Sequence, residues 1–103
     1  MSATSDDLQG QVRQIREFIT AAAEMGIACA RSHAPEHAAF HCARGERLLR
    51  EAEERIRDLS TAAGDCTEVV QVAALAHAAR VQLTSVAFTH RIDMEAARRS
   101  PLH

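Results

Sequence analysis

Residues 35–63 read PEHAAFHCARGERLLREAEERIRDLSTAA, and this stretch indicates the fold. It is rich in Ala, Leu, Glu and Arg, which are strong helix formers. Proline is favoured in a first helical turn and glycine just past the last one, and here Pro35 opens the stretch and Gly64 follows it. Small and apolar residues recur in steps of three and four, as in helices that pack on helices: Ala38, Cys42, Gly45, Leu49, Ala52, Ile56, Leu59 and Ala63.

The other face of this stretch is charged. Ten of the fifteen residues from Arg44 to Asp58 are charged, and opposite charges lie four apart, as in Glu51 and Arg55. Such a pair on an exposed helix contributes only a few tenths of a kcal/mol. We therefore expect this run to form a solvated outer face.

The same packing pattern occurs on both sides of this stretch. Before it, residues 6–31 carry a stripe at alternating steps of four and three: Leu8, Val12, Ile15, Ile19, Ala22, Gly26 and Cys29. After it, residues 66–99 form a third long segment of helix formers. No alternating β pattern lasts beyond four residues. The sequence predicts an all-α fold: one domain over residues 1–103, an antiparallel three-helix bundle with helices near 6–31, 35–63 and 66–99.

The third segment is apolar nearly all round. Between Val69 and Phe88 its only formal charge is Arg80. A helix of this kind lies at the centre of a protein or at an interface, and two partner helices cannot easily cover it. Some of its large residues must then face outward from the bundle: Val72, Leu75, Val81 and Leu83 cannot all face one core. We predict a homo-oligomer, in the simplest case a dimer, packed through this third helix.

Composition excludes several classes of function. The 103 residues hold 12 Lys and Arg, all of them Arg, against 14 Asp and Glu, so the net charge is −2 and no basic excess favours nucleic acid. No apolar run reaches the length of a membrane span. The first residues lack the basic and apolar stretches of a secretory signal, and the three cysteines form no CxxC pair. These features predict a cytoplasmic protein without disulfides.

Histidines gather near the first predicted turn. His33, His37 and His41 are spaced by four, and Cys29 lies one such step earlier. Pro35 interrupts the series, so His37 and His41 are the two that share one helical face, one turn apart. Two imidazoles at this spacing can share one metal ion.

The antiparallel layout adds further ligands to this pair. It places Cys29 level with His37 and brings His90 of the third helix to the same end of the bundle. We therefore predict a metal site formed by His37, His41, Cys29, His90 and His33, with Glu24 and Asp93 as additional ligands. Imidazole together with thiolate favours zinc, copper or nickel. The leading hypothesis is a helical bundle that binds a transition metal or cofactor.

Two other functions are compatible with the sequence. The run His41-Cys42-Ala43-Arg44-Gly45 resembles the HxxKG core of histidine-containing phosphotransfer domains, with Arg in place of Lys. That resemblance implies a helical bundle in which a solvent-exposed His41, beside Gly45, accepts a phosphoryl group. The remaining alternative is a non-catalytic interaction or adaptor protein, which would leave apolar surface exposed for a protein partner. No nucleophile, base and acid set is apparent, so we do not expect an independent enzyme.

Overall fold

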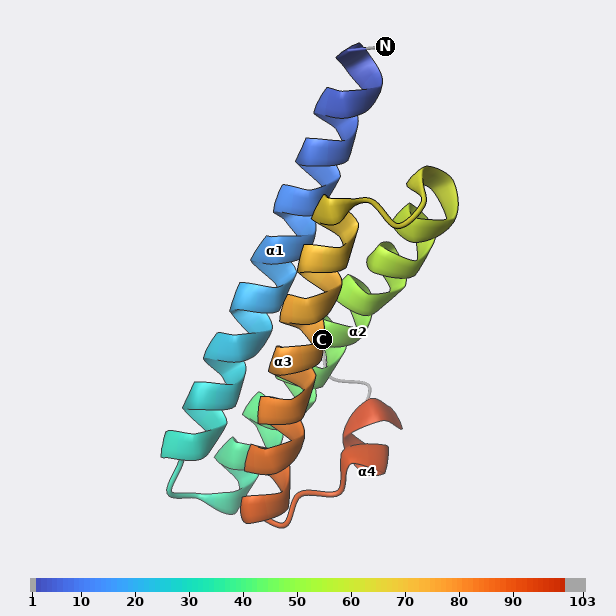
Figure 1. Ribbon diagram of the computed structural model, residues 1–103. Helices are drawn as coiled ribbons and strands as arrows, with labels where there is room; N and C mark the ends of the chain where they lie inside the picture. The colour runs from blue at the N-terminus through green and yellow to red at the C-terminus, as the bar shows by residue number, and fades with distance from the viewer. Residues whose placement is uncertain (1, 100–103) are drawn as a thin grey trace.

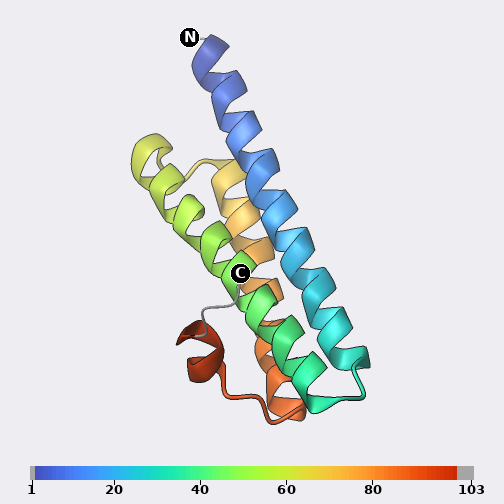
Figure 2. The ribbon, with the colours of Figure 1, turned by 180° about the vertical axis from the view of Figure 1, so that it is seen from behind.

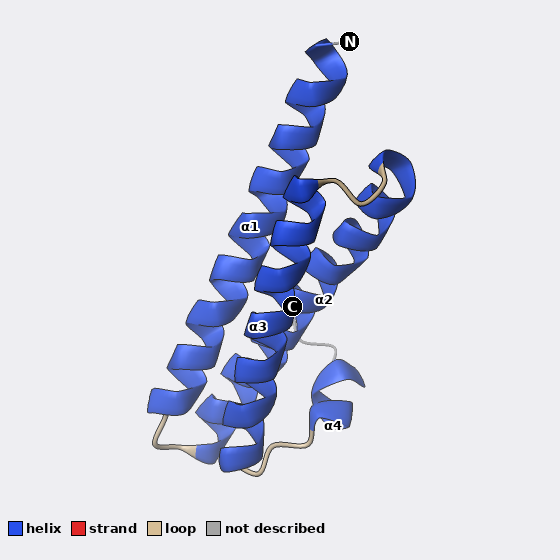
Figure 3. Ribbon diagram, in the orientation of Figure 1, coloured by secondary structure: helices blue, strands red, loops and turns tan. Residues whose placement is uncertain are grey.

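The computed structural model describes residues 2–99, with side chains from residue 7, and confirms the all-α prediction. Its helices are α1 (Ser2–Arg31), α2 (Pro35–Ala63), α3 (Thr67–Thr89) and α4 (Met94–Arg99). The three long helices lie side by side as an antiparallel bundle (Figure 1). Residues 2–99 contain no strand (Figure 3).

The ends of α2 lie where the sequence predicts them. Pro35 occupies the first turn, and Gly64 follows the last residue with φ of 78°. The Gly64 N–H donates to the Ser60 carbonyl oxygen over 2.8 Å. Glycine suits this position because L side chains rarely adopt such a backbone conformation.

The predicted third helix, 66–99, is wrong as one continuous element. After Thr89 the chain turns: the Ile92 N–H donates back to the Ala87 carbonyl oxygen over 2.8 Å, and Arg91 has φ of 57°. This hydrogen bond gives a partner to a carbonyl group in the last turn of α3, which has none within the helix. The Asp93 carboxylate then accepts the Glu95 N–H over 3.0 Å and starts the short helix α4. The first helix also begins earlier than predicted, at Ser2 rather than residue 6.

The core lies along the predicted stripes. On α1 the stripe from Val12 to Cys29 is buried, and on α2 the stripe is buried from Ala38 to Leu59. Gly45 brings α2 close to α1, because a Cβ added there would lie 3.2 Å from Met25 Cβ. A core with many alanines requires such close approach, since small side chains fill little space.

The short helix α4 lies against α2, away from α1 (Figure 2). The Cys42 thiol contacts the Met94 sulfur at 3.4 Å, and Ala97 of α4 is buried. Within the described range, no helix is long and apolar enough to cross a membrane.

Candidate functional site

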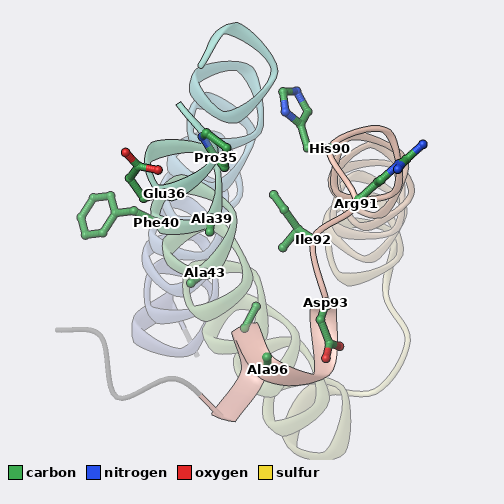
Figure 4. A pocket seen from close by; sticks show the side chains of 11 residues that line it. Pro35, Glu36, Ala39, Phe40, Ala43, His90, Arg91, Ile92, Asp93 and Ala96 are labelled. Atoms are coloured by element: carbon green, nitrogen blue, oxygen red, sulfur yellow. The ribbon is translucent and has the colours of Figure 1, made fainter. Parts of the chain in front are cut away.

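The residues of the predicted metal site do not face one another. Cys29 is fully buried in the core, whereas His33 and His37 are exposed. His41 is half-buried, with its ring edge-on to Phe40 at 5.5 Å between centroids. His90 ends α3 and lies across a groove from Pro35 (Figure 4). The two additional ligands are also apart from these residues: Glu24 is exposed and Asp93 caps α4.

The predicted metal- or cofactor-binding function is therefore wrong. Among the residues that the structure describes, no three His, Cys, Asp or Glu side chains come close enough to hold a metal ion. The thiol chemistry agrees: burial raises the pKa of the Cys42 thiol to about 11, with Cys29 and Glu46 adding to this effect. Burial likewise raises the pKa of the Cys29 thiol. Both sulfurs lie in the core, where burial disfavours the thiolate form that binds metal ions.

The resemblance to phosphotransfer domains rests on His41 and Gly45, and the structure gives Gly45 another role. Gly45 is buried between α1 and α3: a Cβ there would meet Met25, Ala22 and Leu83 at 3.2–3.4 Å. Gly45 therefore allows the helices to pack closely and does not leave an open surface beside His41. The His41 Nδ1 atom is itself buried without a hydrogen-bond partner. His41 is thus half-buried rather than fully exposed, and it lies one turn from a glycine that packs against α1.

An apolar groove lies where α4 meets the start of α2. Its volume is about 670 Å³, within the range of small-molecule sites. Figure 4 shows Ile92 pointing across it toward Ala39, while Arg91 points away. The groove is open on its outer side, where Phe40 is 43% exposed. Its wall is formed by the α2 residues Pro35, Glu36, Ala39, Phe40 and Ala43 together with residues 90–93, Ala96 and Ala97.

A buried ion network, not a solvated face, lies beside this groove. Glu46 is fully buried, and its carboxylate binds the guanidinium groups of Arg80 from α3 and Arg98 from α4. Arg80 also pairs with Glu53 at 2.8 Å. Burial lowers the pKa of Arg80, but hydrogen bonds to Glu53 and Glu46 outweigh burial and raise it above its ordinary value.

Sequence reasoning placed Glu46 on a solvated face and so missed this network. Two features of the sequence could have revealed it. Arg80 is the single charge in the apolar run from Val69 to Phe88, and Glu46 directly follows Gly45, which belongs to the packing stripe. Because a buried charge needs a partner, each of these residues points to the other. The network fixes the relative positions of α2, α3 and α4.

The outer face of α3 carries a second packing stripe. We call it the outer stripe; its members recur in steps of four and three, and all are exposed: Val70, Ala74, His77, Val81, Thr84 and Phe88. Val70 is 54% exposed, Val81 55% and Phe88 84%. The inner stripe of α3, from Val69 to Ala87, faces the core. The same helix thus carries residues at helix-packing spacing on two different faces, and the bundle covers only one of these faces.

Comparison with protein-family models, with curated proteins and with solved structures found no match to this chain. A proposal about its function must therefore start from its own surfaces.

Proposed function

We propose that the chain is a non-catalytic interaction module that self-associates through the outer stripe of α3. The observation that carries the proposal is the exposure of Val70, Val81 and Phe88 at the spacing that helices use to pack on one another. Apolar residues exposed singly are common, but large apolar residues repeated along one face of a helix mark an interaction surface.

Hydrophobic burial gives the scale of the association. Fully burying a Val or Phe side chain contributes roughly 1.5–3 kcal/mol. Scaled by the exposed fractions of Val70, Val81 and Phe88 and counted in both copies, the outer stripe contributes about 6–12 kcal/mol. Association costs about 4–15 kcal/mol in lost freedom. The outer stripe alone therefore supports a weak dimer, and a stronger one needs neighbouring surface.

The adaptor hypothesis also expects apolar surface that remains free once α3 is paired. The groove between α2 and α4, with the exposed Phe40 at its edge, is such a surface. It opens beside α4, which packs on α2 rather than on the outer stripe. This separation supports a module with two binding surfaces.

Matched substitutions test the proposal. We expect Val81→Glu to weaken self-association at least about a hundredfold, or about 2.7 kcal/mol, because each dimer would bury two unpaired carboxylates. Phe40→Glu introduces the same charge at an exposed apolar position on α2 and is expected to leave the dimer intact. Sedimentation velocity over a concentration series measures both variants. A wild-type monomer at high micromolar concentration, or equal effects of the two substitutions, would contradict the proposal.

A further inference from the structure

The segment that follows α3 is attached to the bundle by few contacts. We call residues 92–99 the strap; it consists of the short helix α4 and the two residues before it. Among the long helices, α4 packs chiefly on α2. In Figure 1 it stands beside the bundle and is joined to α3 by a loop. A helix of six residues is too short to be stable by itself in water, so its contacts with α2 must keep it helical.

The strap contacts α2 at Cys42 and Glu46, which are one helical turn apart. The Cys42 thiol lies 3.4 Å from the Met94 sulfur, and the Glu46 carboxylate binds the Arg98 guanidinium at 3.3 Å. Of the side chains of the strap only Ala97 is buried, whereas Met94 is half-buried and Arg98 is exposed. Docking of the strap therefore removes little apolar surface from water.

The apolar groove separates part of the strap from α2. It lies between the first turns of α2 and residues 90–93, and it continues along Ala96 and Ala97. Ile92 points across it toward Ala39 (Figure 4). A gap of this kind leaves the atoms that line it without partners on one side, so packing contacts are lost. The strap is therefore packed less tightly on α2 than the three long helices are on one another.

The turn before the strap holds one residue in a strained conformation. Arg91 has φ of 57°, in the left-handed region that L side chains rarely adopt. The turn is kept closed by the Ile92 N–H, which donates to the Ala87 carbonyl oxygen over 2.8 Å. Strain of this kind persists only where the surrounding contacts maintain it. Release of the strap allows Arg91 to leave this conformation, so the strain favours an open state.

The buried carboxylate keeps a partner when the strap detaches. Arg80 of α3 binds Glu46 and also pairs with Glu53 at 2.8 Å, so this part of the network lies within the three long helices. The other part holds the strap: Arg98 binds Glu46, and the Arg50 guanidinium donates to the Arg98 carbonyl oxygen at 3.3 Å. Detachment breaks the second part only. The three long helices then avoid the large cost of a buried charge without a partner.

We propose that the strap opens as a unit while α1, α2 and α3 stay folded, and that this opening gates the groove beside α2. Regions with few buried apolar contacts open at a lower free energy than the whole domain. Opening removes one wall of the groove and uncovers the Cys42 thiol. Cys29 stays covered, because it lies in the core on α1 and α4 lies away from α1 (Figure 2). The opening does not require self-association, so this proposal and the proposed function can fail separately.

Thiol modification distinguishes opening of the strap from unfolding of the whole chain. A Cys66→Ser chain retains the two fully buried thiols, Cys29 and Cys42. Mass spectrometry measures the initial rate at which each reacts with methyl methanethiosulfonate, since trypsin cleavage after Arg31 places them on separate peptides. We expect Cys42 to react at least about tenfold faster than Cys29. Its rate should also rise less steeply with urea, because opening exposes less surface than unfolding does.

Substitutions in the bundle and in the strap give the decisive comparison. Ile15→Val weakens the core on α1 equally in the closed and open states, because Ile15 is fully buried among the long helices. It should speed the reaction of Cys29 about fivefold and leave that of Cys42 unchanged. Arg98→Ala removes a contact that only the closed state makes, and it should speed the reaction of Cys42 about fivefold, or about 1 kcal/mol. Arg99→Ala, at the next and exposed position, is the control and should change neither rate by more than about twofold.

Three results would overturn the proposal. Equal rates for the two thiols in the Cys66→Ser chain would show that Cys42 has no route to solvent of its own. Equal acceleration of both thiols by Ile15→Val would show that Cys42 is reached only when the whole chain unfolds. An Arg98→Ala chain that reacts like Arg99→Ala would show that the contact with Glu46 does not hold the strap.

Discussion

Replacing Arg80 by alanine leaves the buried Glu46 carboxylate with a single guanidinium partner. Glu46 is fully buried, and the remaining partner, Arg98, is 43% exposed and lies 3.3 Å away. Removing one partner of a buried ion pair costs about 3–5 kcal/mol, because the other charge stays buried. Since Arg98 still compensates part of the charge, we expect a loss near 3 kcal/mol, a large share of the 5–15 kcal/mol typical of small domains.

Urea denaturation followed by circular dichroism measures this loss. A 3 kcal/mol change moves the midpoint by about 1–3 M urea. Arg44→Ala, at an exposed position on α2, is the control and should cost within about 0.5 kcal/mol. The double variant Glu46→Leu/Arg80→Leu should lose less than Arg80→Ala, because it leaves no buried charge at position 46. If Arg80→Ala behaves like Arg44→Ala, the network does not stabilise the bundle as described.

Three further predictions concern stability. Burial raises the pKa of the Cys42 thiol from 9.0 to about 11. As pH rises, this thiol therefore ionises first in the unfolded chain. The free energy of unfolding then falls between these pH values by up to about 1.4 kcal/mol per pH unit. Urea titrations should show a shallower fall for Cys42→Ala and a wild-type fall for Cys66→Ala. Arg91→Gly should add about 0.5–1 kcal/mol to the free energy of unfolding and so raise the thermal midpoint, because glycine adopts the left-handed backbone at this position without strain. A lower midpoint would contradict the assigned turn. Gly45→Ala should cost about 1–3 kcal/mol through overpacking, whereas Gly10→Ala, in open space, should gain up to about 1 kcal/mol; calorimetry of both variants checks this contrast.

Periodicity predicts the fold well because burial in a helical bundle follows the helical repeat. The stripes on α1 and α2 are buried as expected, and Pro35 and Gly64 lie at the ends of α2. The break after Thr89 was missed because Arg91 takes a conformation that favours glycine. An arginine at such a position gives no sequence signal of a turn.

The metal hypothesis failed for a geometric reason. An antiparallel layout predicts which residues share a level along the bundle, but a metal site also requires that they point in one direction around each helix. Cys29 points into the core, while His37 on the neighbouring helix is exposed. Spacing by four relates residues within one helix only. The outer stripe of α3 was predictable in part, since the sequence already showed too many apolar residues for one core.

Hydroxyl-radical footprinting of Phe88 tests most directly whether the outer face of α3 is buried between copies. Phe88 is 84% exposed in the single chain, and Phe40, at 43%, lies outside the proposed contact. Mass spectrometry reads the oxidation of both rings at a low concentration, where the chain is monomeric, and at a high one. We predict that oxidation of Phe88 falls several-fold at high concentration while that of Phe40 is unchanged. Equal oxidation of Phe88 at both concentrations would contradict self-association through α3.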